Sequence, residues 1–246
     1  MLDLSKYQQN SILAGLGADE LKQIAPHLEL VTLSCAQVVY EMNEELKYVY
    51  FPTTAIASLA CTLKDGSSVQ VAMVGNEGML GISVSMGGGI ALTQATISIS
   101  GSCYRISTKS LQEALNRSGG RRTGILQQLL QNYAQSLMVE MAQTTACNRR
   151  HSIDQHLCRW LLLNIDRVNS NSLAMTHEFI AQMLGVRRES ISEAAQRLQQ
   201  ASIISYHRGH INIIKKSQLE SRACECYSIL KQKKPSSKSA NMLHAA

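Results

Sequence analysis

Residues 175–198, MTHEFIAQMLGVRRESISEAAQRL, constrain the fold more than any other stretch of the chain. Thr176 is suited to cap a first helix, because its hydroxyl can accept a hydrogen bond from a free N–H of the first turn. Gly185 stands where a left-handed residue would end that helix, and a second helix follows Val186. Each helix has apolar residues spaced for one buried face: Ile180, Met183 and Leu184 in the first, and Ile191, Ala194, Ala195 and Leu198 in the second.

The first turn of the second helix carries polar side chains that the same spacing directs outward: Arg187, Arg188, Glu189 and Ser190. The helix dipole favours anions at this end, so helix stability does not call for arginine here. A short helix with exposed arginines at its N-terminal end fits the major groove of DNA. The pattern predicts a helix-turn-helix, although a helical hairpin with a charged surface remains the alternative.

Residues 201–214 follow directly and alternate in polarity, which predicts two strands with a turn at Arg208-Gly209. Glycine supplies the positive φ that such a turn needs. A hairpin placed after a recognition helix is a wing. Its tip, with His207, Arg208 and His210, suits contact with a phosphate backbone.

This order of helix, turn, Arg-Arg-Glu-Ser helix and hairpin resembles the DNA-binding domain of the Crp/Fnr superfamily of bacterial transcription regulators. The resemblance implies that Arg188 donates to a guanine edge and that Glu189 accepts from a cytosine amino group, pairings that groove chemistry also favours. Glu193 departs from the pattern, because the best-known members carry a second arginine there. The expected DNA-binding residues are Thr176, His177, Arg187, Arg188, Glu189, Ser190, Glu193, His207, Arg208 and His210.

The N-terminal half predicts a short helical stretch at 12–27 and then many short strands. The expected strands span 28–33, 37–41, 48–51, 55–63, 69–74, 82–86, 96–99 and 103–106. With the C-terminal resemblance, this half resembles the cyclic-nucleotide-binding jelly roll, and the resemblance then covers about Ser11 to Tyr227. The expected fold class is α+β, with an N-terminal β jelly roll, a long dimerisation helix and a C-terminal winged helix-turn-helix.

The resemblance breaks down at the nucleotide site. Gly75-Asn76-Glu77-Gly78 matches the Gly-Glu turn of nucleotide-binding members, but Leu92-Thr93 stands roughly where an Arg-Ser pair would hold the phosphate. No lysine or arginine occurs between Lys64 and Arg105, so a buried phosphate would depend on backbone amides. We therefore do not expect cAMP as effector. The candidate effector pocket comprises Gly75, Glu77, Gly78, Thr93 and Tyr133, and it binds an unknown small ligand or is filled by its own side chains.

Residues 124–148 predict a long helix with two apolar stripes, one for the roll and one for a partner helix. The expected dimer interface is the stripe Leu126, Leu130, Tyr133, Leu137 and Met141. The second stripe comprises Leu129, Val139 and Ala146. A two-fold dimer would present two recognition helices one DNA turn apart, whereas the alternative is a helix buried in a large monomer.

Seven cysteines are scattered through the chain, at 35, 61, 103, 147, 158, 224 and 226, which indicates reduced thiols. Cys224-x-Cys226 is the only close pair and makes half a zinc site, with no second pair near it in sequence. We expect no metal. The iron–sulfur regulators of the superfamily have cysteines clustered near the N-terminus, and none precedes Cys35 here, so we expect no such cluster.

Charge is divided unevenly along the chain: residues 1–110 hold 6 basic and 9 acidic side chains, and residues 111–246 hold 18 and 9. A basic C-terminal half indicates the part that meets nucleic acid. The expected domains are a β-roll sensor at 1–120, a dimerisation helix at 121–150, a winged helix-turn-helix at 151–228 and a basic, disordered tail at 229–246. No apolar run has the length of a membrane span and no signal sequence begins the chain, so we expect a cytoplasmic location.

These features predict a dimeric, sequence-specific transcription regulator that binds double-stranded DNA, with RNA polymerase as a candidate further partner. We expect neither a cofactor nor catalysis, because the chain has no Walker loop, paired metal ligands or nucleophile signature. The alternative is a small-molecule-binding or enzymatic β-roll protein whose helical C-terminal region only mediates assembly.

Overall fold

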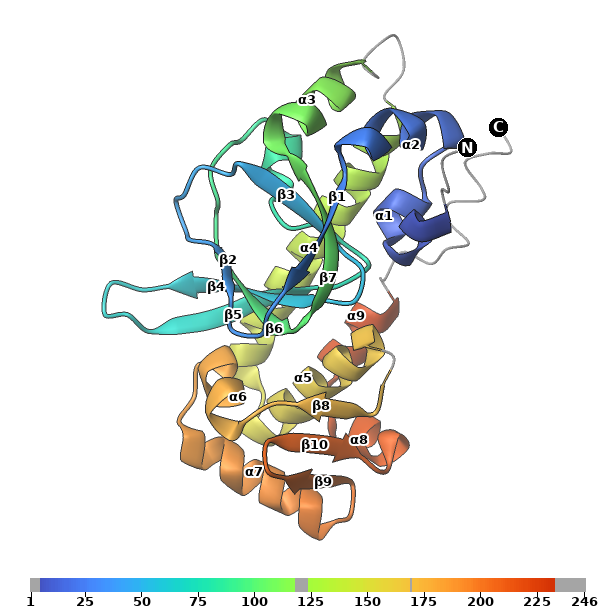
Figure 1. Cartoon of the computed structure of the whole chain (residues 1–246). Helices are drawn as coiled ribbons and strands as arrows, with labels where there is room; N and C mark the ends of the chain where they lie inside the picture. The colour runs from blue at the N-terminus through green and yellow to red at the C-terminus, as the bar shows by residue number, and fades with distance from the viewer. Residues whose placement is uncertain (1–4, 118–123, 169, 233–246) are drawn as a thin grey trace. The chain divides into compact units, whose positions relative to one another are not determined.

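A computed structural model describes residues 5–117, 124–168 and 170–232 (Figure 1). Their contacts divide them into two compact units. The first comprises residues 5–59 and 73–138, and the second comprises residues 60–72 and 139–232. No helix of the described residues is long and apolar enough to cross a membrane.

Seven strands form the β-roll, in two sheets, and β1–β7, β3–β7 and β2–β6 pair antiparallel. One sheet has the order β1-β7-β3 and the other the order β2-β6-β4-β5. Val49 pairs with Ile106 and Phe51 with Tyr104, and all four side chains are buried. The strands are β1 (Glu29–Leu33), β2 (Val38–Tyr40), β3 (Tyr48–Pro52), β4 (Ile56–Thr62), β5 (Ser68–Val74), β6 (Gln94–Ile99) and β7 (Gly101–Ser107). The expected α+β class with an N-terminal roll is confirmed.

The prediction of a strand at residues 82–86 was wrong, because Ile82–Met86 forms a 3₁₀ helix, η3. Gly81 and Gly87 bracket it, each with φ of 84°, and both reverse the chain in a conformation that glycine adopts without strain. The alternation Ile82, Val84 imitates a strand, but Ser83 and Val84 are the residues that it buries. The other helices before residue 118 are η1 (Ser5–Gln9), α1 (Ser11–Ala14), α2 (Ala18–Ile24), η2 (Ala25–His27) and α3 (Thr108–Arg117).

Helix α4 (Ile125–Arg150) begins in the first unit and packs on it through the stripe that was expected at the dimer interface. The Ile125 N–H donates to Glu20 Oε1 over 3.0 Å, and Gln127 Nε2 donates to the Ser85 carbonyl over 3.4 Å. Four residues of the stripe are buried within one chain: Leu126, Leu130, Tyr133 and Leu137. Met141 is half-buried. Buried side chains have little surface left for a partner, so the expected interface is corrected for these four residues, which belong to the core of the first unit.

The second unit contains a winged helix-turn-helix. Its helices are α5 (Ile153–Val168), α6 (His177–Leu184), α7 (Arg188–Gln200), α8 (Lys216–Arg222) and α9 (Glu225–Gln232). Its strands are β8 (Ser172–Ala174), β9 (Ile204–His207) and β10 (His210–Ile213), in the order β8-β10-β9. The two-stranded wing was expected and β8 was not. Helix α9 takes in residues 229–232 of the expected tail, and residues 233–246 lie outside the described residues.

Candidate nucleic-acid interface

The turn between α6 and α7 forms as its sequence predicts. Thr176 caps α6, with its Oγ1 accepting a hydrogen bond from the Phe179 N–H over 3.1 Å. Gly185 ends the helix at φ of 64°, and the Val186 N–H then donates to the Ala181 carbonyl over 3.0 Å. The left-handed conformation of Gly185 thereby turns the chain from α6 into α7, while the N–H groups of the turn keep hydrogen-bond partners.

Helix α7 has one buried and one exposed face. Its buried face holds Ile191, Ala194, Ala195 and Leu198, as expected. At its start, Arg187, Arg188 and Glu189 are exposed, and so is Glu193 one turn on. Ser190 is half-buried. Arg187 occupies the N-cap position without capping the helix through its side chain, so its guanidinium is free of any structural role in the helix start.

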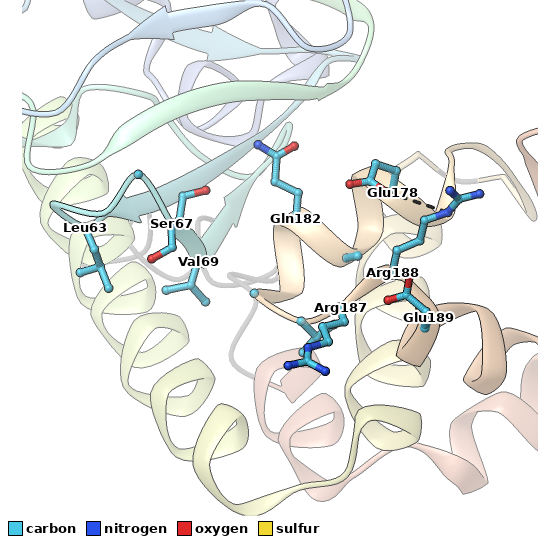
Figure 2. A pocket seen from close by; sticks show the side chains of 13 residues that line it. Leu63, Ser67, Val69, Glu178, Gln182, Arg187, Arg188 and Glu189 are labelled. Carbon is cyan, nitrogen blue, oxygen red and sulfur yellow. Dashed lines mark ion pairs between the residues drawn. The ribbon is translucent and has the colours of Figure 1, made fainter.

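Arg188 lies beside Glu178 of α6, with Nε 3.9 Å from Oε2, and Figure 2 shows this pair over the turn. Both side chains are largely exposed, 65% and 74%, so water screens the attraction. An exposed pair at this distance contributes at most about 1 kcal/mol. The guanidinium can therefore leave Glu178 for a stronger partner at little cost.

Arg197, by contrast, is held in the domain. Its Nη2 and Nε donate to the two oxygens of Asp154 in α5, over 2.7 and 3.0 Å. This hydrogen bonding raises the pKa of Arg197. Glu193 lies 4.0 Å from Arg197 Nη1, so the acid at the departing position of the family motif faces an arginine on its own helix.

The wing presents the three expected side chains. His207, Arg208 and His210 are exposed, and β9 and β10 pair from His207↔His210 to Ile204↔Ile213. Arg208 and Gly209 have φ of 47° and 81°, which confirms the turn and shows that Arg208 also adopts a left-handed conformation. The Gly209 carbonyl accepts a hydrogen bond from the Met175 N–H over 2.7 Å, so the wing is joined to the start of α6.

His177, which was expected on the DNA-facing surface, is half-buried and contacts the neighbouring elements of the domain. Its ring stacks on Tyr206 of β9 with centroids 4.0 Å apart, and its Nδ1 lies 3.1 Å from Ser192 Oγ of α7. Burial and the positive charge of Arg188 lower the pKa of His177. His177 therefore links α6, α7 and the wing.

Sequence reasoning missed a hollow beside the recognition helix, lined by His177, Ser192, Ala195, Gln196, Gln199 and Gln200. Ser192, Gln196 and Gln199 follow Arg188 at steps of four, four and three residues along α7. That spacing places them on one face of the helix and was a signal available in the sequence. They extend the polar face beyond the Arg-Arg-Glu-Ser turn.

The expected effector pocket in the roll is closed at its glycine turn. The Gly78 N–H donates to the Gly75 carbonyl over 3.1 Å, so this amide already has a partner. A Cβ on Gly78 would lie 2.3 Å from Tyr133 Cε2, which means that the ring of Tyr133 covers the glycine. Asn10, fully buried, donates from Nδ2 to the Gly78 carbonyl over 2.9 Å. The structure thus brings Gly75, Gly78 and Tyr133 together, and they fill this part of the expected pocket with the chain's own atoms.

The first cation after the glycine turn along the chain, Arg105, is engaged elsewhere. Arg105 donates from Nε to Glu29 Oε2 over 2.8 Å, and its guanidinium lies 4.7 Å from the ring centroid of Tyr48. Thr93 is buried just before β6, and Glu77 is half-buried in the glycine turn.

Comparison with known proteins agrees with this geometry. Residues 155–222 match the model of the Crp-like helix-turn-helix domain. No curated protein matches the chain. Solved structures share its fold. FixK2 from Bradyrhizobium japonicum is 18% identical over 80% of this chain and 98% of its own, with a TM-score of 0.66. Two regulators from Thermus thermophilus are also similar: TTHB099 of the CRP family (17% identity, 78% of this chain, 96% of its own, TM-score 0.62) and TTHA1359 of the CRP/FNR family (14% identity, 79% of this chain, 98% of its own, TM-score 0.58).

The matched domain and the exposed first turn of α7 define a protein with a Crp-like winged helix-turn-helix, the class of domain that binds DNA. Residues 155–222 thus match a Crp-like helix-turn-helix domain, and the fold of the chain is similar to that of solved regulators of the CRP and CRP/FNR families.

Proposed function

We propose that this regulator reads each half of a two-fold symmetric operator through the first turn of α7, while the wing holds the phosphate backbone. The observation that carries the proposal is the exposed Arg187-Arg188-Glu189 turn, which among the described residues forms one ion pair, to Glu178, that is weak and exposed. Arg188 is the candidate for bidentate contact with guanine, and Glu189 for contact with a cytosine amino group. Arg208, at the wing tip, is the candidate for phosphate contact.

The test is quantitative binding to an operator selected from random DNA by the wild-type protein. Arg188→Ala should weaken specific binding by about 1–3 kcal/mol and relax the preference at one base pair of each half-site. Arg208→Ala should instead weaken binding to all sequences alike and reduce the salt slope by about 1.

Glu178→Gln is the matched control, because it removes the ion-pair partner of Arg188 and leaves the guanidinium in place. Its affinity should equal or exceed that of the wild type. If Arg188→Ala kept both the affinity and the sequence preference of the wild type, the assignment of α7 as the recognition helix would be wrong.

Dimerisation belongs to the same proposal, with a revised interface. The face of α4 that stays exposed in one chain includes Gln131, Gln135, Met138 and Ala142, spaced four, three and four residues apart. This is the spacing of a coiled-coil seam. We place the partner helix on this face and keep RNA polymerase as a candidate further partner, to be tested by co-sedimentation on operator DNA.

The roll itself is proposed to bind no cyclic nucleotide. The covered glycine turn and the engaged Arg105 leave a phosphate without a cation, which makes its removal from water costly. Calorimetry with cAMP or cGMP should show no binding up to about 100 μM, a free energy weaker than about −5.5 kcal/mol. Micromolar binding of either nucleotide would contradict this part of the proposal while leaving the DNA-reading part intact.

A further inference from the structure

Four side chains with metal-binding atoms converge at the C-terminal end of α4. They are Cys147 of α4, His151 just beyond it, Cys224 before α9 and Cys226 in its first turn. Their donor atoms all lie within 4.8 Å of one another. The three cysteines are buried, and the His151 side chain is 16% exposed. The expectation that Cys224-x-Cys226 lacks a second half is thus overturned, because the fold supplies Cys147 and His151 from a segment more than 70 residues away in sequence.

The separations are those of ligands around one ion. Cys147 Sγ lies 3.5 Å from Cys224 Sγ, and His151 Nδ1 lies 3.5 Å from Cys226 Sγ. A tetrahedral ion with bonds of about 2.3 Å to sulfur and about 2.0–2.1 Å to nitrogen keeps its ligands about 3.4–3.8 Å apart. These two separations already match those of ligands around one ion, and the remaining ones, none above 4.8 Å, need to shorten by at most about 1 Å for the four groups to surround an ion.

Neighbouring polar side chains contact two of the four residues, His151 and Cys226, in the way that hydrogen-bond partners of metal ligands do. His151 turns Nδ1 toward the sulfurs, and its Nε2 lies 3.3 Å from Glu225 Oε1. A carboxylate on the far ring nitrogen fixes the tautomer that frees the other nitrogen for a metal. Gln143 Nε2 donates to Cys226 Sγ over 3.1 Å, a contact that favours the thiolate.

The local charges also fit a metal thiolate cluster. Three thiolates and one divalent cation leave a net charge of −1. Arg159 is only 6% exposed, its Nη2 donates to Thr144 Oγ1 over 2.6 Å, and within the described ranges it forms no ion pair with a carboxylate. Its positive charge acts on Cys147.

We propose that Cys147, His151, Cys224 and Cys226 bind one Zn²⁺ ion in a closed, tetrahedral, structural site. Three cysteines and one histidine without an open position are a ligand set of structural zinc. Binding transfers the remaining thiol protons to solvent and changes no oxidation state. The ion joins the end of α4 to the α8–α9 junction within the second unit, independently of whether the domain binds DNA.

The first experiment needs no variant. The full-length protein is purified under reducing conditions and its metal content measured, which should give about one zinc per chain. After removal of zinc with a chelator, added Co²⁺ should produce a thiolate-to-cobalt charge-transfer band and the visible bands of tetrahedral coordination. Zinc should also protect Cys147, Cys224 and Cys226 from alkylation. A fully reduced protein that takes up neither ion, or a disulfide between Cys147 and Cys224 in the protein as purified, would overturn the proposal.

Variants then assign the ligands. Cys147→Ser and Cys224→Ser should lower bound zinc to less than about a tenth of an equivalent, and Glu225→Gln should weaken zinc affinity about 10–100-fold in competition with a chelator. Cys158→Ala, a buried thiol outside the four, and Cys35→Ser, an exposed one, should keep the full equivalent. Loss of zinc from these controls, or its retention by both ligand variants, would refute the assignment.

Discussion

His177 illustrates how a single residue joins the elements of the helix-turn-helix domain. Its place at the first position of α6 made it a candidate for DNA contact, yet its ring stacks on Tyr206 and reaches Ser192. The sequence could not predict this, because the stacking partner comes from the wing, which meets α6 only in the folded domain. Arg188, at the start of the next helix, keeps the exposure that the pattern predicted.

The lowered pKa of His177 makes the stability of this domain depend on pH. Burial, and then the charge of Arg188, hold the pKa of the folded state below 6.5, the ordinary value. As the pH falls below about 6.5, the unfolded chain binds a proton that the folded chain does not, so acid lowers the free energy of unfolding.

His177→Gln should therefore lose less of its melting temperature than the wild type when the pH falls from about 7.5 to about 5. Thermal unfolding followed by circular dichroism measures this difference. His207→Gln, at the exposed end of β9, is the control and should keep the wild-type dependence. An equal pH dependence in all three proteins would contradict the assignment of the effect to His177.

At the scale of elements, local patterns predicted most of the fold. Recurring short apolar segments predicted all seven strands of the roll, and capping residues, glycine turns and the alternation at 201–214 predicted α6, α7 and the wing. Three features were not predicted from the sequence, each for a physical reason. Ile82–Met86 alternates like a strand, but glycines with positive φ close it into a 3₁₀ helix. Strand β8 is three residues long and exists because β10 pairs with it. The cysteine and histidine cluster depends on contacts between distant helices.

A buried ion pair between elements gives a second prediction. Arg167 of α5 and Glu140 of α4 are 3.0 Å apart, and their side chains are 3% and 13% exposed. Arg167→Met removes the cation from a nearly buried carboxylate and should cost about 3–5 kcal/mol of unfolding free energy. The double variant Arg167→Met/Glu140→Leu should recover most of that loss, because it removes both charges.

Chemical denaturation of the four corners of this cycle measures the coupling. Arg197→Met, which breaks the exposed pair with Asp154, should cost much less and serves as the control. Equal losses for Arg167→Met and the double variant would show that burial of the uncompensated carboxylate is not the cause.

At the scale of the whole molecule, α4 has a buried face, which belongs to folding, and an exposed face, to which we assign assembly. Leu130 is fully buried, so Leu130→Asp would place a charge inside the chain's own core and unfold it rather than dissociate a dimer. Met138 is 56% exposed and lies in the seam that we assign to the partner helix. Substitution there leaves the core of one chain intact.

Met138→Asp should therefore convert the dimer to a monomer at micromolar concentration while the melting curve keeps its cooperative form. An aspartate in the seam would face the same residue of the second chain across a two-fold axis, and the two like charges would be desolvated together. The affinity for the specific operator should fall when the dimer dissociates, because one chain reads only one half-site. Sedimentation velocity and operator binding measure both effects.

Leu92→Asp makes the same change at a residue that is 73% exposed elsewhere on the first unit, and it should leave the dimer and its operator affinity unchanged. A wild-type protein that sediments as a monomer, or a Met138→Asp dimer as stable as that of Leu92→Asp, would remove α4 as the assembly helix.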